Sequence, residues 1–279
     1  MNTNKELSKE DYVEPRCLLC DEPFGKSPDI KPVPQQRIMQ KVDEYMSRRD
    51  YAGVERHLLY WLEEARLGHD LRGELMIENE LIGHYRKMGN ESAAMSHIDQ
   101  AIALIDKLDY AGSISAGTTY VNAATACEAF GHNEKAAVFF SQAKEAYESA
   151  ESVNPSLLGG LYNNMALNDS ALQRFDEAME LYQMALKVMG TVPGGGLEQA
   201  ITYLNMADTE VARKGTDSDD SVIFKWLDLA EKLLLNPDAP QDGYYAFVCE
   251  KCAPSFSVYG YFATAKELKE RAEKIYAGS

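Results

Sequence analysis

Two Cys-x-x-Cys pairs are the residues of this 279-residue chain whose type and spacing could do chemistry. Cys17 and Cys20 lie near one end of the sequence, and Cys249 and Cys252 lie near the other. Four thiolates are the ligand set of a tetrahedral structural zinc site. Nearly the whole chain separates the two pairs, whereas zinc modules normally keep their pairs close. A shared zinc site therefore requires the two ends of the chain to meet.

Two other interpretations of the cysteines stay open. Cys249 and Cys252 fall where packed residues are expected, so they are equally consistent with small hydrophobic core residues, as is Cys127. Cys17 and Cys20 could form a separate redox or metal pair. In a cytosolic chain, reduced thiols or metal ligands are expected rather than disulfides.

No other motif indicates catalysis. The sequence contains no P-loop, no Gly-x-Ser-x-Gly and no His-Glu-x-x-His, and its five histidines are scattered without the spacing of a metal pair. We therefore expect a non-enzymatic protein with no cofactor other than the zinc considered above.

The composition and net charge of the chain indicate which classes of partner it can bind. The chain is 45% hydrophobic and 26% charged, as is usual for a globular protein, and its formal net charge is −16. Such a charge disfavours nucleic acid and anionic membranes and makes a basic or neutral partner easier to accommodate. No transmembrane run and no secretory signal is found, so the predicted location is cytoplasmic.

The elements that must position any site are helices. Residues 1–34 contain two of the cysteines and five prolines without helical periodicity, so we expect an extended N-terminal arm. Residues 35–279 show apolar side chains at intervals of three and four, which predicts helices. Six helix–turn–helix pairs are expected, covering about 35–65, 71–108, 115–150, 155–189, 197–234 and 241–276.

Residues 120–187 hold two nearly superimposable units. Tyr120 and Tyr162 begin matching segments 42 residues apart, and Ala101, Ala143 and Ala185 repeat at the same interval. A fixed period in this range is the signature of a solenoid. The interval lengthens once, where an acidic turn at 215–221 is inserted.

The repeats resemble the tetratricopeptide repeat (TPR) family. In the clearest unit the residues that match its consensus are Tyr162, Met165, Ala166, Ala178, Tyr182 and Ala185. The standard repeat has about 34 residues, and the longer repeats here resemble those of kinesin light chains and of bacterial peptide-sensing regulators. The resemblance implies an all-α, right-handed superhelical solenoid of about six repeats, with the first helix of each pair lining a concave face.

Asparagines recur on these first helices. Asn122, Asn164 and Asn205 occupy equivalent places, and Asn79 and Asn163 lie one position earlier. Asparagine is a poor residue for a helix interior, and its amide both donates and accepts hydrogen bonds. We interpret the five as a row that grips the backbone of an extended peptide; the alternative is that each caps or bridges helices structurally.

The leading functional prediction is a scaffold or adaptor that binds a protein or peptide segment on the concave face. The alternative is a signalling regulator whose superhelix changes shape when a peptide binds. A self-associating solenoid, for example a homodimer, is the third interpretation.

Overall fold

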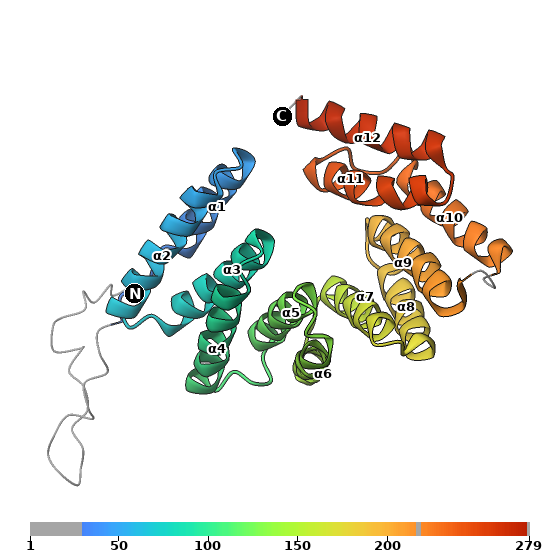
Figure 1. The fold of residues 1–279 in the computed structure, drawn as a ribbon. Coiled ribbons are helices and arrows are strands. Elements are labelled where there is room, and N and C mark those ends of the chain that lie inside the picture. Colours follow the sequence, from blue (N-terminus) through green and yellow to red (C-terminus); the bar gives the residue numbers. More distant parts are fainter. Residues whose placement is uncertain (1–29, 216–218, 278–279) are drawn as a thin grey trace, which may run out of the picture. The chain divides into compact units, whose positions relative to one another are not determined.

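The structure is a computed structural model that describes residues 30–215 and 219–277, and every regular element in these ranges is an α-helix (Figure 1). The twelve helices are α1 (Gln35–Ser47), α2 (Tyr51–Leu67), α3 (Leu71–Met88), α4 (Glu91–Leu108), α5 (Ile114–Ala129), α6 (Asn133–Ser149), α7 (Pro155–Ala171), α8 (Phe175–Met189), α9 (Gly196–Lys214), α10 (Asp220–Leu234), α11 (Gly243–Val258) and α12 (Phe262–Ala277). The predicted all-α class and the six pairs are confirmed.

The chain forms two compact units, residues 1–81 and 82–279, and the division falls inside α3. In the first unit, α1 packs on α2. The segment that precedes α1 is held against the turn between α2 and α3: the Lys31 N–H donates to the Gly68 carbonyl (2.8 Å), and the Val33 N–H donates to Asp70 Oδ2 (2.9 Å). Asp70 also accepts from the Gly73 N–H, so one buried carboxylate caps α3 and fixes this segment.

In the second unit, helices pack within and between hairpins. The pairs α5/α6, α7/α8, α9/α10 and α11/α12 are in contact, and α6 and α8 pack on the first helix of the following hairpin, α7 and α9. Fully buried alanines such as Ala136 and Ala178 allow this close approach, and Phe140 and Tyr182 fill the space beside them. This nearest-neighbour packing is that of a repeat solenoid.

Local signals place the helix boundaries. Pro155 occupies the first turn of α7, where its missing N–H costs nothing, and the Asn154 side chain caps that helix. Tight turns at Gly131 (φ +81°) and Gly260 (φ +84°) join α5 to α6 and α11 to α12. Across the described residues, no helix is both long and apolar enough to cross a membrane.

Candidate functional site

The predicted asparagine row lies on one face of successive first helices. Asn122, Asn164 and Asn205 each stand two residues before a fully buried alanine, in α5, α7 and α9 respectively. Their side chains are half-buried, which places them at the edge of the packed interior. Equivalent positions on stacked first helices follow one another along the solenoid, so these three asparagines lie in line within the second unit.

The five asparagines do not have the same role. Asn205 Nδ2 donates to Asn163 Oδ1 across the α7–α9 contact (3.1 Å), and Asn163 is only 8% exposed. This bond ties two first helices together, which is the structural role considered above. Asn79 lies in the first unit and donates to the Leu75 carbonyl of its own helix (3.0 Å). Asn164 makes no side-chain hydrogen bond with the residues that the structure describes.

Asn168, one turn beyond Asn164, was not predicted as part of the row. It is 1% exposed, and its Oδ1 is the one buried side-chain oxygen in the described ranges without a hydrogen-bond partner. A third helix-interior asparagine in α7 was the available sequence signal. Because a buried, unpaired carbonyl costs stability, the site carries a local penalty that packing elsewhere offsets.

The first helices also carry carboxylates that sequence reasoning did not single out. Burial raises the pKa values of Glu128 (to about 7), Asp169, Glu198 and Asp208. Arg174, whose Nη1 lies 3.6 Å from Asp169 Oδ1, opposes the effect at Asp169. Asp208 accepts a hydrogen bond from the Tyr259 hydroxyl (2.7 Å), which also opposes the rise. Burial therefore leaves these four carboxylates of the first helices incompletely solvated.

Replacing Glu128 by Gln should stabilise the protein at alkaline pH. Between its ordinary pKa of 4.5 and about 7, folded Glu128 holds a proton that the unfolded chain releases, so its contribution to stability falls as pH rises through this window. We expect Glu128→Gln to raise the free energy of unfolding by about 1 kcal/mol at roughly pH 8, after allowance for solvent screening.

Urea unfolding at several pH values measures this difference. The gain should shrink to nothing near pH 4, where the glutamate is protonated in both states. A gain that does not depend on pH would contradict the assignment.

Comparison with known proteins gives the fold a name. No family model and no curated protein matches the chain. Among solved structures, it is similar to a Podosopora anserina protein named as a kinesin light chain with nearly identical TPR-like repeats: the identity is 18%, the match covers 73% of this chain and 95% of that one, and the TM-score is 0.50. The chain has a TPR-like repeat fold.

A second similar structure is BtubC from P. vanneervenii, which is 18% identical. The match covers 88% of this chain and 92% of that one, with a TM-score of 0.48. A third, a tetratricopeptide repeat protein from Parabacteroides merdae, is 15% identical, with coverage of 86% and 93% and a TM-score of 0.42.

The TPR-like fold explains why two of the cysteines are buried. Cys249 stands thirteen residues before the first residue of α12, as Tyr120 and Tyr162 do before α6 and α8. It therefore occupies the packed tyrosine position of the repeat, and Cys252 stands three residues later, where the preceding repeats have Ala123, Met165 and Met206. Both are almost fully buried, with Cys249 at 0% and Cys252 at 2% exposure.

We expect Cys127, Cys249 and Cys252 to be unreactive in the folded protein. Burial raises the pKa of all three thiols, that of Cys252 to about 12, so almost no thiolate is present at neutral pH. Titration with a coloured disulfide reagent should detect these three thiols only after denaturation; mass spectrometry of the labelled native protein identifies which cysteines react. Rapid native labelling of Cys252 would contradict its burial.

The shared zinc site remains a proposal. Cys17 and Cys20 lie outside the described residues, and within the described ranges no group of three or more potential ligands could hold a metal ion. Burial also raises the free energy needed to ionise Cys249 and Cys252 as ligands. Stoichiometric zinc in the purified protein, lost in Cys17→Ser, would support the site, and its absence would refute it.

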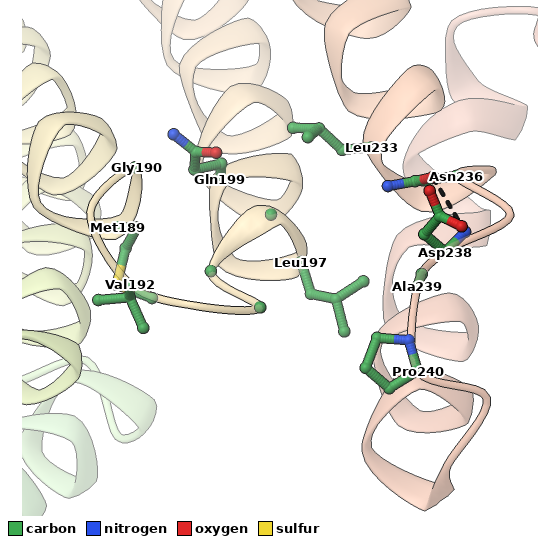
Figure 2. A pocket seen from close by; sticks show the side chains of 13 residues that line it. Met189, Gly190, Val192, Leu197, Gln199, Leu233, Asn236, Asp238, Ala239 and Pro240 are labelled. Carbon is green, nitrogen blue, oxygen red and sulfur yellow. Dashed lines mark hydrogen bonds between the residues drawn. The ribbon is translucent and has the colours of Figure 1, made fainter.

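One pocket lies at the ends of the hairpins rather than on the first-helix face. It has a volume of about 350 Å³ and is lined by the α8–α9 connector, including Gly194, Gly195 and Gly196, and by the turn after α10 (Figure 2). In that turn, the Asp238 N–H donates to Asn236 Oδ1 (3.0 Å). Among the described residues that line the pocket, Asp238 is the one with a charged side chain. No second acid–base group or nucleophilic side chain among these described residues lines the pocket beside it. The pocket does not support a catalytic role.

Proposed function

We propose that this protein is a non-enzymatic scaffold that binds an extended peptide segment on the first-helix face of its TPR-like repeats. The observation that carries the proposal is the position of Asn164. It lies on that face between Asn122 and Asn205, it is partly accessible, and the described residues leave its amide uncommitted. An amide with free donor and acceptor groups can pair with the backbone of any peptide, whatever its side chains.

The fold supports a role of this kind. A stack of hairpins presents a continuous surface built from equivalent helices, and repeat proteins use such extended surfaces for binding. The Asn205–Asn163 bond contributes by fixing the spacing of α7 and α9, so that neighbouring amides keep a constant separation. In this arrangement Asn205 and Asn163 position the face, and Asn164 and Asn122 contact the peptide.

Binding to an array of peptides with random but known sequences tests the proposal. Asn164→Ala and Asn122→Ala together should reduce capture of peptides of every charge class by about tenfold, because each lost amide removes hydrogen bonds to the peptide backbone. The thermal melting curve should stay nearly unchanged. Capture equal to that of the unmodified protein would refute the asparagine row as the binding site.

Asn205→Ala is the matched structural control. It leaves buried Asn163 without its donor, so it should lower stability by about 1 kcal/mol or more, and any loss of binding should accompany that change. Small-angle scattering with and without a captured peptide separates the two functions. Constant dimensions fit a scaffold, and compaction would instead indicate a peptide-responsive regulator.

A further inference from the structure

The first helix of the sixth hairpin, α11, exposes an apolar face. Tyr244 (48% exposed), Phe247 (52%) and Val258 (80%) follow one another at helical spacing together with the exposed Pro254. The rings of Tyr244 and Phe247 stack with their centroids 6.4 Å apart. We call these four residues the α11 stripe. Large exposed apolar surface of this kind, rimmed by polar residues, typically marks an interaction site.

The α11 stripe occupies the same place on its helix as the asparagine row. Lys251, in the middle of the stripe, stands two residues before the buried Ala253, as Asn205 stands before Ala207. Tyr244 and Glu198 are also equivalent by this count, and the Tyr244 hydroxyl donates to the Glu198 carboxylate. The stripe therefore continues the proposed binding face from α9 onto α11.

Two carboxylates of α9 border the stripe without a close cation. Glu198 accepts from Tyr244, and Asp208 accepts from the Tyr259 hydroxyl (2.7 Å). No Lys or Arg nitrogen of the described residues lies within 4.0 Å of either carboxylate. Lys251 is near enough to oppose the rise in the pKa of Glu198, which burial causes. Neutral tyrosine hydroxyls thus solvate two charges that a cationic side chain could pair with directly.

The charge of the chain indicates which occupant fits. A second copy would bring another formal charge of −16 to a face already bordered by carboxylates, and like charges across an interface oppose association. A segment with basic side chains between apolar ones satisfies both features, since the apolar side chains cover the α11 stripe while the basic ones meet Glu198 and Asp208.

We infer that the α9–α11 face binds a cationic peptide segment in which basic and apolar residues alternate. This inference rests on the proposed scaffold function and names the class of segment that its C-terminal repeats select. The apolar side chains lie against Tyr244 and Phe247, and a Lys or Arg of the partner lies between α9 and α11.

Fluorescence anisotropy with a labelled peptide of alternating Leu and Lys tests the inference on the full-length protein. Peptides of Leu with Glu, and of Ser with Lys, are the probe controls. Phe247→Ala should weaken binding of the Leu/Lys peptide about tenfold through lost apolar contact. Glu198→Gln should weaken it about threefold, with a reduced salt dependence.

Matched variants on another face separate these effects from general ones. Val138→Ala removes an exposed apolar side chain of α6, and Glu177→Gln removes one negative charge from α8. Neither should change binding of the Leu/Lys peptide. Circular dichroism melting checks that Phe247→Ala and Glu198→Gln remain folded.

Three outcomes would overturn the inference. The Leu/Glu peptide binds as tightly as the Leu/Lys peptide, the Leu/Lys peptide does not bind, or Phe247→Ala binds the Leu/Lys peptide as tightly as the unmodified protein does. Self-association that Phe247→Ala abolishes would show that a second copy covers the stripe. If the variants at Asn122 and Asn164 bind peptides of all charge classes more weakly while Phe247→Ala and Glu198→Gln bind as before, the scaffold function stands and only the inference fails. If the asparagine variants bind as before, the scaffold proposal itself fails.

Discussion

Tyr182→Ala should lower the free energy of unfolding by about 3–5 kcal/mol, as expected when a large aromatic side chain is removed from a packed core. Tyr182 in α8 is 0% exposed and packs against Ala166 of α7 and Met206 of α9. It therefore joins its own hairpin to the next one, and its loss opens a cavity at the contact on which nearest-neighbour stability depends.

Two control variants show how much of the lost stability comes from the ring of Tyr182 and how much from its hydroxyl. Tyr182→Phe keeps the ring but removes the hydroxyl that lies 3.2 Å from Thr209 Oγ1, so it should cost about 1 kcal/mol. Val138→Ala, at a side chain 59% exposed, should change stability by less than about 0.5 kcal/mol. Denaturant unfolding followed by circular dichroism measures all three. A cost for Tyr182→Ala no larger than that for Tyr182→Phe would contradict the packing role.

Arg66→Ala should destabilise the first unit by about 2–4 kcal/mol, because it withdraws a cation from a buried carboxylate. Arg66 Nη2 lies 2.9 Å from Oε1 of Glu78, whose side chain is 0% exposed, and Arg66 Nε lies 2.8 Å from Oε1 of Glu74. One guanidinium thus bridges α2 to two successive turns of α3. Lysine offers a single point charge, so Arg66→Lys should recover only part of the loss.

The double variant Arg66→Ala, Glu78→Gln gives the decisive comparison. Neutralising Glu78 removes the charge that Arg66 compensates, so the double variant should be more stable than Arg66→Ala alone, by at least about 1 kcal/mol. Thermal unfolding at neutral pH, with hydrogen exchange to locate the change in α2 and α3, provides the measurement. A double variant less stable than Arg66→Ala would show that Glu78 stabilises the unit through its other contacts.

The helices, their order and their grouping into hairpins could be predicted from the amino-acid sequence alone. Apolar side chains at intervals of three and four predict helices such as α1, α2 and α10, because a helix of this kind buries one face whatever its neighbours are. Turn residues such as Gly131 and Gly260, and the proline at the start of α7, set the boundaries to within a few residues. The 42-residue repeat then predicted which helices pack together, since equivalent residues must make equivalent contacts.

The contacts of individual side chains, in contrast, depend on how the helices pack in three dimensions. The asparagine row follows from the sequence, but the bond from Asn205 to Asn163 depends on the distance between α7 and α9, which no local pattern specifies. The α11 stripe is apolar at helical spacing, as a buried face would be. Its exposure becomes evident only once α9 and α12 cover the other sides of α11. Periodicity indicates that a helix has an apolar face, and packing decides whether that face lies in the core or remains available to a partner.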